Sequence, residues 1–369
     1  MTYSQLFESA KLGKLELRNR TLVAPMTRVS ASASGCVGPL MQPYYERFGK
    51  GGFGAIITEG VYTDQHFSQG YQFQPGITDK TQAASWAELI KGVKATGAKI
   101  IMQLMHAGAL SQFNRFSNET RGPSPVQPKG HQMEFYRGSG MYPTPSEMTV
   151  SEIKTAICGF ADSAKRAQEA GADGVEIHSA NGYLLDQFLT DYANQRGDQY
   201  GQGIFERARL TCEVLEAVRD AVGGDFTVGV RLSQSKVNDF EHKWAGQRDD
   251  AKVIFEAVEA SGADYVHTTE FVAQASAFQH GASLAAHAKN LTGLPVIANG
   301  GLGDPAIAQK MILQDECDFV AIGKDALVTQ NWPVKLQKNE ARRPFDFEMF
   351  TPLADLETAN AYFSARAEI

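Results

Sequence analysis

Cysteine is scarce in this sequence, and its four copies stand far apart, at Cys36, Cys158, Cys212 and Cys317. No Cys-x-x-Cys pair is present that could hold zinc or an iron–sulfur cluster, and the spacing does not suggest a disulfide framework. A reducing compartment fits this cysteine usage best. The eight histidines do not fall at metal-ligand spacing either, so we expect no catalytic metal.

Long hydrophobic runs and a basic excess are also missing. No segment approaches the length of an uninterrupted membrane span, and the first residues lack the basic and apolar regions of a targeting signal. Lysine and arginine number 35 against 42 acidic residues, which gives a net charge of −7 without a basic stripe. We therefore expect a cytoplasmic protein that binds neither nucleic acid nor membranes.

Short apolar runs rich in β-branched residues are abundant, and 43% of the 369 residues are apolar, enough for a sizeable core. Eight such runs recur along the chain, at residues 21–26, 55–61, 99–104, 174–179, 226–233, 265–270, 295–300 and 318–324. Most are apolar at consecutive positions, which is typical of parallel strands covered on both faces.

Helical patterns lie between these runs. The clearest covers residues 152–170, where Thr149 and Glu152 predict a capping box at the start. Three helices end in a similar Gly-Ala phrase before the next strand, with glycine where a left-handed cap is needed, at Gly97, Gly171 and Gly262. This repetition indicates a βα unit.

Eight strands alternating with helices predict an α/β fold, a single (β/α)₈ TIM barrel over residues 1–369. Residues 113–149, rich in Gly, Pro and Ser, are expected to form a capping excursion over the barrel mouth after the third strand. The alternating residues 11–18 predict an N-terminal hairpin that closes the barrel floor, and residues 336–369 form a C-terminal extension. In such barrels the active site lies at the C-terminal ends of the strands.

One strand end carries three polar side chains together, His178, Asn181 and Tyr183. Neutral imidazole and carboxamide groups can both donate a hydrogen bond to one carbonyl oxygen, and a phenol beside them can deliver a proton. The pattern indicates a site that activates a carbonyl group and supplies a proton. The structural alternative is three satisfied polar residues at the end of a strand.

Other strand ends add groups that suit a flat, phosphorylated cofactor. Glycines after the last two strands, together with Lys324, are typical of a phosphate site, because small residues let backbone amides approach an anion. Arg231 could stabilise a ring that becomes anionic on reduction, while Gln103 and Thr27 could bond a heterocycle. Each residue also has a purely structural explanation, but flavin mononucleotide (FMN) has both parts.

Six segments resemble the old yellow enzymes in order and spacing, from about residue 5 to residue 335. They are residues 19–28 (Asn-Arg-Thr-Leu-Val-Ala-Pro-Met-Thr-Arg), 54–60, 103–108, 178–185, 228–232 and 321–324. The resemblance implies an FMN-dependent ene-reductase, in which hydride passes from NADH or NADPH through flavin N5 to the β-carbon of an activated alkene. The alkene would be an α,β-unsaturated carbonyl or nitro compound, and the kinetics would be ping-pong.

The resemblance also implies a role for each matching residue. His178 and Asn181 would hold the substrate oxygen, and Tyr183 would protonate the neighbouring carbon. The isoalloxazine would be lined by Pro25, Met26, Thr27 and Gly60, with Gln103 at its pyrimidine edge and Arg231 near N1. The phosphate would be bound by Gly300, Gly301, Gly323 and Lys324.

Departures from the family pattern bear on these roles. Members commonly have arginine where Lys324 stands, and loss of the planar fork is expected to weaken or reorganise phosphate binding. Thr27 replaces the cysteine of one branch, which argues against thiol tuning of the flavin, and Met105 replaces the tryptophan of another. No Gly-x-Gly-x-x-Gly turn is present that would indicate a separate dinucleotide-binding domain.

Two other functions stay open at this point. One is a flavin-free barrel lyase or aldolase acting on a phosphorylated substrate, although no persuasive Schiff-base lysine is present. The other is a flavin-binding barrel that has lost its chemistry. A small-molecule substrate is the expected partner, and a homodimer is left open. Four aromatic residues near loops are interpreted as packing and not as site residues, namely Tyr71, Trp244, Phe271 and Phe278.

Overall fold

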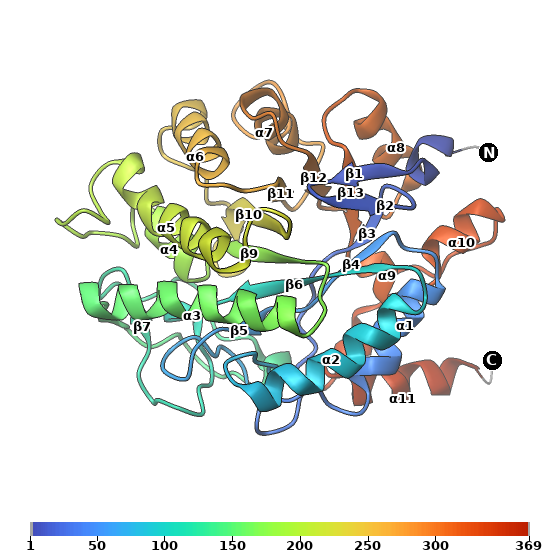
Figure 1. Ribbon diagram of the computed structural model, residues 1–369, viewed down its shortest axis with the longest axis horizontal. Coiled ribbons are helices and arrows are strands. Elements are labelled where there is room, and N and C mark those ends of the chain that lie inside the picture. Colours follow the sequence, from blue (N-terminus) through green and yellow to red (C-terminus); the bar gives the residue numbers. More distant parts are fainter. Residues whose placement is uncertain (1–2, 368–369) are drawn as a thin grey trace.

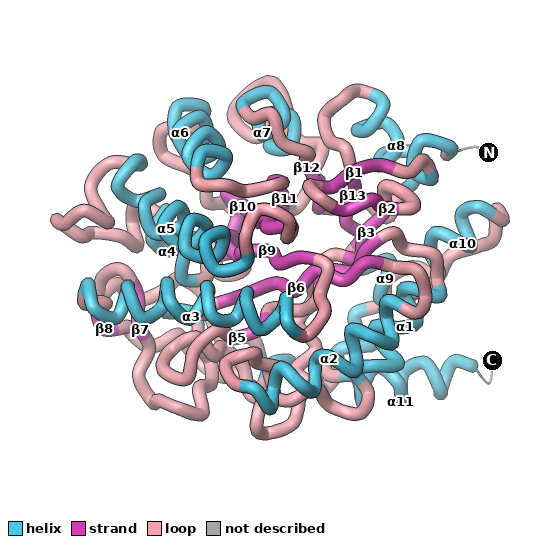
Figure 2. The backbone as a smooth tube through the Cα atoms, in the orientation of Figure 1, coloured by secondary structure: helices cyan, strands magenta, loops and turns pink. Residues whose placement is uncertain are grey.

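Eight parallel strands close into a barrel in the computed structural model of the chain, which describes residues 3–367 (Figure 1). Helices surround the strands, as Figure 2 shows. The strands follow one another around the barrel as β3 (Thr21–Val23), β4 (Ala55–Ile57), β6 (Lys99–Met105), β9 (Gly174–Asn181), β10 (Thr227–Lys236), β11 (Tyr265–Thr269), β12 (Val296–Asn299) and β13 (Phe319–Ile322). β13 pairs with β3 and closes the ring. The predicted (β/α)₈ barrel is confirmed.

The second predicted strand differs from the observed one. The sequence predicts one strand over residues 55–61, whereas the structure contains β4 and a separate β5 (Val61–Tyr62), both paired with β6. Between them the Glu59 amide donates to the Tyr45 hydroxyl at 3.0 Å and not to a neighbouring strand. Because Tyr45 comes from a helix, the apolar run alone could not reveal this interruption.

The helices complete the βα repeats. They are α1 (Met41–Lys50), α2 (Lys80–Lys94), α3 (Val150–Glu169), α4 (Leu184–Leu189), α5 (Ile204–Val222), α6 (Arg248–Ala260), α7 (Leu284–Leu291), α8 (Pro305–Leu313), α9 (Lys324–Val328), α10 (Trp332–Gln337) and α11 (Leu356–Ala367). Short 3₁₀ turns occur at Ser4–Phe7, Gly108–Leu110, Glu134–Tyr136 and Phe347–Phe350. Helix α3 has the predicted capping box, and the glycines after α2, α3 and α6 have the predicted left-handed φ angles of 81°, 91° and 89°.

A hairpin closes the floor of the barrel, as predicted. It consists of β1 (Ala10–Leu12) and β2 (Leu15–Leu17), which pair antiparallel. Leu12 and Leu17 are fully buried and pack against inward-facing residues of the strands. The Lys14 amide donates to the Thr227 hydroxyl at 3.1 Å, at the first residue of β10. Access to the barrel interior is therefore left to the opposite end.

The excursion of residues 113–149 reaches that open end. It contains the 3₁₀ turn Glu134–Tyr136 and a small parallel pair, β7 (Arg121–Gly122) with β8 (Ser146–Glu147). The Tyr136 hydroxyl donates to the backbone carbonyl of Thr27, just beyond β3, at 3.1 Å. The excursion thus spans from one side of the mouth to the other.

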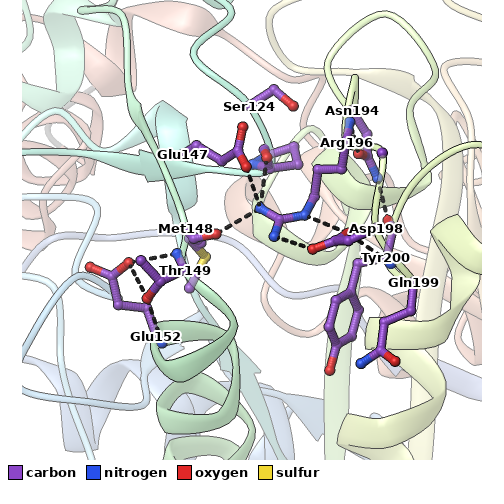
Figure 3. A network of polar contacts seen from close by, with 12 residues as sticks. Ser124, Glu147, Met148, Thr149, Glu152, Asn194, Arg196, Asp198, Gln199 and Tyr200 are labelled. Atoms are coloured by element: carbon purple, nitrogen blue, oxygen red, sulfur yellow. Dashed lines mark hydrogen bonds and ion pairs between the residues drawn. The ribbon is translucent and has the colours of Figure 1, made fainter.

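A buried arginine, Arg196, ties two segments of the excursion to the barrel (Figure 3). Its Nη1 donates to the carbonyl oxygens of Pro123 at 3.1 Å and Met148 at 2.6 Å. Asp198 pairs with the other side of the guanidinium, and Glu147 lies 3.4 Å from Nη1. Since one side chain bonds two segments of the excursion, one in its first half and one at its end, the position of the excursion is fixed by the loop that follows α4.

The C-terminal extension returns to the excursion. The Ala354 amide donates to the Phe135 carbonyl at 2.9 Å, and Arg137 pairs with Asp355 at 3.1 Å. The sequence assigns residues 336–369 to this extension and residues 1–369 to one domain, of which residues 1–2 and 368–369 lie outside the described chain. Within residues 3–367, no helix has both the length and the apolar character that crossing a bilayer requires.

Candidate functional site

A cleft of about 610 Å³ opens at the C-terminal ends of the barrel strands. All thirteen residues singled out from the sequence line it: Pro25, Met26, Thr27, Gly60, Gln103, His178, Asn181, Tyr183, Arg231, Gly300, Gly301, Gly323 and Lys324. The volume lies in the range of about 300–1,000 Å³ that is usual for small-molecule and cofactor sites. These residues come from the ends of seven of the eight barrel strands, and they converge because parallel strands end at one rim.

His178 presents a neutral imidazole to the cleft. It lies on β9 with 3% of its surface exposed, in register with Arg231 of β10. Burial lowers the pKa of His178 well below its usual value, and the nearby charge of Arg231 lowers it further. Its Nδ1 is buried and has no hydrogen-bond partner among the described residues. An unprotonated ring with free bonding capacity suits a ligand better than a structural role.

Asn181 is held at the last residue of β9 in a left-handed conformation, with φ 62°. Its amide donates to the Ser233 hydroxyl at 2.8 Å, and its carbonyl accepts from the Val237 amide at 3.1 Å. Asparagine tolerates this conformation better than most residues. The backbone is therefore held on both sides at the point where the carboxamide extends to the cleft wall.

Tyr183 follows two residues later, before α4, and its hydroxyl lies 2.6 Å from the hydroxyl of Tyr71. Its ring meets the His178 ring edge to face, with centroids 5.0 Å apart. Burial raises the pKa of Tyr183, so the phenol is protonated at neutral pH. The interpretation of Tyr71 as packing missed this contact, since 112 residues separate the two tyrosines and no local motif connects them.

Arg231 is a buried cation that spans the cleft floor. Its Nη2 donates to the Thr269 hydroxyl at 3.1 Å and to the Asn299 side-chain oxygen at 2.8 Å. Burial lowers the pKa of Arg231 to about 10, although the charge of Glu176 opposes this, and the side chain stays charged. Its Nε is buried and unpartnered within the described chain. The unpaired nitrogen leaves room for an acceptor supplied by a ligand.

Gln103 is oriented by a residue that the sequence interpretation did not single out. Its Nε2 donates to Glu176 at 2.8 Å, and Glu176 also accepts from His267 at 2.8 Å and Tyr265 at 3.1 Å. Burial favours a higher pKa for Glu176, but its partners outweigh burial and hold the pKa below its usual value. A charged carboxylate takes the amide N–H, so the Gln103 oxygen is left for the cleft. The position of Glu176, two residues before His178 on the same strand, was the sequence signal that could have identified this residue.

The glycine-lined end of the cleft is shaped for close approach. At Gly300, with φ 138°, an added Cβ would collide with the Glu270 carbonyl oxygen. At Gly323 the nearest atom to an added Cβ is 3.8 Å away, so this residue borders open space. Lys324 begins α9 beside it, with Nζ 5.7 Å from the ring centroids of Phe271 and Phe345. The arrangement suits an anionic group.

The remaining wall is apolar and comes from distant parts of the chain. Met105 of β6 and Val237 after β10 lie near the predicted residues, while the excursion contributes Met133, Phe135 and Tyr136 and the C-terminal extension contributes Phe350. The sequence interpretation named Met105 as a departure from the family pattern. It did not name the other residues, because loop aromatic residues carry no pattern that distinguishes a pocket wall from packing. Among residues 3–367 there is no group of three His, Cys, Asp or Glu side chains that could hold a metal ion.

Comparison with known proteins identifies the family. Residues 5–343 match the NADH:flavin oxidoreductase / NADH oxidase family. The NADH oxidase of Thermoanaerobacter brockii is 31% identical over 353 residues, which cover 92% of this chain and 52% of the relative. The chain thus spans about half the length of the first curated relatives that it matches.

Solved structures agree with this match. Morphinone reductase in complex with tetrahydroNAD has a TM-score of 0.82 and 28% identity, covering 94% of this chain and 93% of its own. The old yellow enzyme from Trypanosoma cruzi has a TM-score of 0.84 and 26% identity, covering 95% and 96%. FMN is the cofactor that this family implies. The chain belongs to the NADH:flavin oxidoreductase / NADH oxidase family, that of the old yellow enzymes.

Proposed function

We propose that this protein is an FMN-dependent ene-reductase that uses NADH or NADPH to reduce an activated alkene. The observation that carries the proposal is the meeting of three groups, His178, Asn181 and Tyr183, on the wall of one cleft whose far end is lined by glycines and Lys324. An oxygen-binding pair beside a protonated phenol matches the needs of an alkene conjugated to a carbonyl or nitro group.

The residues of the cleft fit FMN. The unpartnered Arg231 Nε and the free Gln103 oxygen offer a donor and an acceptor to a flat heterocycle. We infer that Pro25, Met26, Thr27 and Gly60 line its ring, and that Gly300, Gly301, Gly323 and Lys324 hold its phosphate. FMN, when bound, supplies the redox chemistry, taking hydride from a reduced nicotinamide and giving it to the alkene.

The protein side chains would polarise the substrate and complete the proton balance. Donation from His178 and Asn181 to the substrate oxygen draws electrons from the alkene, which makes its β-carbon electrophilic. Tyr183 then breaks its O–H bond and forms the new C–H bond at the α-carbon. The net reaction adds one hydride and one proton, and Tyr183 recovers its proton from water.

A single cleft would serve both half-reactions. Reductant and alkene each need the exposed face of the same ring, and the hairpin blocks the other end of the barrel. The two compounds therefore alternate, which predicts ping-pong kinetics. The bound tetrahydroNAD named for morphinone reductase, a protein of this fold, supports a nicotinamide compound as one of the two.

Family membership leaves the flavin-free lyase without support, and Lys324 is the single lysine lining the cleft within the described chain. A flavin-binding relic remains the competing hypothesis. Tyr183 separates the two, because a relic has no use for an acid positioned beside an oxygen-binding pair.

The test is a two-stage stopped-flow experiment on the FMN-loaded protein. Anaerobic reduction by NADH or NADPH is followed first, and reoxidation by cyclohexenone, maleimide or a nitroalkene second. Tyr183→Phe is expected to keep the rate of reduction but to slow reoxidation by the alkene about 10²- to 10⁴-fold, the usual contribution of a general acid. Protein that stays colourless after addition of FMN, or a wild type that reduces none of these alkenes, would contradict the proposal.

A further inference from the structure

Tyr71 contacts Tyr183 but does not belong to the cleft lining. Its side chain is fully buried, whereas Tyr183 lines the cleft. The Gln69 side chain donates to the Tyr71 carbonyl, and the Gln74 side chain accepts from the Tyr71 amide at 3.3 Å. The Tyr136 ring packs against it at a centroid distance of 4.8 Å. The phenol is therefore held in one place, with its hydroxyl 2.6 Å from that of Tyr183.

The direction of this hydrogen bond follows from counting protons. Either hydroxyl could donate, and each has one proton to place. If Tyr183 donated to Tyr71, the Tyr71 proton would be left without an acceptor inside an apolar cluster, which carries a desolvation cost. If Tyr71 donates, its proton is satisfied and the Tyr183 proton is free to face the cleft. The second arrangement uses both protons.

The same arrangement matters more after proton transfer. Once Tyr183 has given its proton to the substrate, a phenolate remains in a buried, apolar environment, which is unfavourable without a donor. Tyr71 is the one described side chain that hydrogen-bonds to the Tyr183 hydroxyl. A hydrogen bond to an ionised oxygen is roughly twice as strong as a neutral one. Tyr71 would thus favour the product of the transfer over the reactant.

We propose that Tyr71 is a positioning residue for the reaction, donating to Tyr183 so that the acidic proton faces the cleft and the phenolate left behind is stabilised. This inference rests on the proposed function. Tyr71 does not change the proton balance of the transfer to the substrate. It keeps its own proton, and Tyr183 is the group that loses a proton and regains one.

The acidities of the two phenols agree with this direction. Burial raises the pKa of Tyr183, and the bond from Tyr71 lowers that pKa. Burial also raises the pKa of Tyr71, and the bond to Tyr183 raises that pKa further. Tyr71 is thus the weaker acid of the pair, as a residue that donates without releasing its proton should be.

A neighbouring phenol provides a matched control. Tyr142 belongs to the same apolar cluster and is 1% exposed, but its hydroxyl donates to Gln112 at 3.3 Å. Tyr142→Phe therefore removes a buried hydroxyl from this cluster without removing the hydrogen bond between Tyr71 and Tyr183. Thermal stability and FMN content of Tyr71→Phe and Tyr142→Phe are compared first, so that a folding defect is recognised before rates are measured.

The decisive experiment measures alkene-driven reoxidation of the FMN-loaded variants in H₂O and in D₂O. Tyr71→Phe is expected to slow this step about ten- to hundred-fold, as loss of one hydrogen bond to a charged group implies, with nicotinamide-driven reduction unchanged. The solvent deuterium isotope effect on this step is expected to increase, because proton transfer from Tyr183 becomes slower. Tyr142→Phe is expected to match the wild type in both readouts.

Double substitution separates this inference from the proposed function. Since Tyr71 acts through Tyr183, Tyr71→Phe combined with Tyr183→Phe should be no slower than Tyr183→Phe alone. A normal rate in Tyr71→Phe, or an additive loss in the double variant, would overturn the role of Tyr71 and leave Tyr183 as the acid. A normal rate in Tyr183→Phe would instead remove the proposed acid itself.

Discussion

Lys236 Nζ lies 2.8 Å from both carboxylate oxygens of Asp186, and the two side chains are 2% and 0% exposed. Asp186 also accepts from the Gly182 amide at 2.6 Å, between Asn181 and Tyr183. The buried pair therefore connects the end of β10 to the turn that carries Asn181, a proposed substrate-binding group, and Tyr183, the proposed proton donor. It fixes that turn from outside the cleft.

Removing one partner of this pair is expected to destabilise the protein. Lys236→Met leaves Asp186 buried and uncompensated, which costs about 3–5 kcal/mol in comparable cases. Lys236→Met with Asp186→Leu should recover part of this loss, because no charge then remains buried. Urea unfolding measures the stability of the single and the double variant. Lys252→Met, in an exposed helical pair with Glu256, serves as the control and should change stability by less than about 1 kcal/mol. A loss in Lys236→Met no larger than the control would contradict the prediction.

Binding of a substrate-like oxygen should depend on His178 and Asn181 separately. Each substitution by alanine removes one hydrogen bond, so the dissociation constant of a phenol is expected to rise about ten-fold per site. Because burial and Arg231 hold the pKa of His178 well below 6.5, the ring stays neutral, and enone binding should show no inflection near that pH. Absorbance titration of the flavin at several pH values measures the dissociation constants of the variants and the pH dependence of binding. An inflection that disappears in His178→Ala would show that the ring titrates.

Lys324 should contribute to FMN affinity through its charge. Lys324→Ala is expected to weaken binding about ten-fold, while Lys324→Arg should tighten it several-fold, because a planar guanidinium can form two parallel bonds to a phosphate. Fluorescence titration of the apoprotein with FMN measures the dissociation constants. Lys338→Ala, at an exposed lysine outside the cleft, should behave as the wild type. Unchanged affinity in Lys324→Ala would place the phosphate elsewhere.

The stability of the protein should fall between weakly acidic and weakly alkaline pH because of Glu59. This carboxyl group is 1% exposed, and burial raises its pKa from 4.5 to about 7, despite hydrogen bonds and charge from Arg28 that lower it. A raised pKa means that the folded state binds the proton more tightly than the unfolded state. The stabilisation that comes from proton binding at Glu59 is therefore complete below the pKa of the unfolded state. It is lost as pH rises through the pKa of the folded state.

Urea unfolding from about pH 5 to about pH 8 tests this, with an expected loss of roughly 3 kcal/mol at about 1.4 kcal/mol per pKa unit. Glu59→Gln carries no titrating proton, so its stability should decline less over the same range. Equal slopes for the two proteins would assign the pH dependence to other groups.

Local patterns were sufficient to predict the barrel and part of the cleft lining, whereas Pro25, Met26 and Gly60 were predicted from the family resemblance. Consecutive apolar positions indicate strands covered on both sides, and the carboxyl ends of parallel strands meet at one rim, so residues such as Gln103 and Arg231 must converge. The pattern could not predict contacts between loops. The pairing of Tyr71 with Tyr183, and the position of Phe350 on the cleft wall, depend on how distant segments pack.

The joining of the excursion to the C-terminal extension has a consequence for biosynthesis. One wall of the cleft comes from Phe135 and Phe350, and the Ala354 amide bonds the Phe135 carbonyl. A ribosome-bound chain that has already formed all eight strands still lacks this wall until residues 350–355 have left the exit tunnel. Capture of the coenzyme is therefore expected only after residues 350–355 have emerged and packed against the excursion.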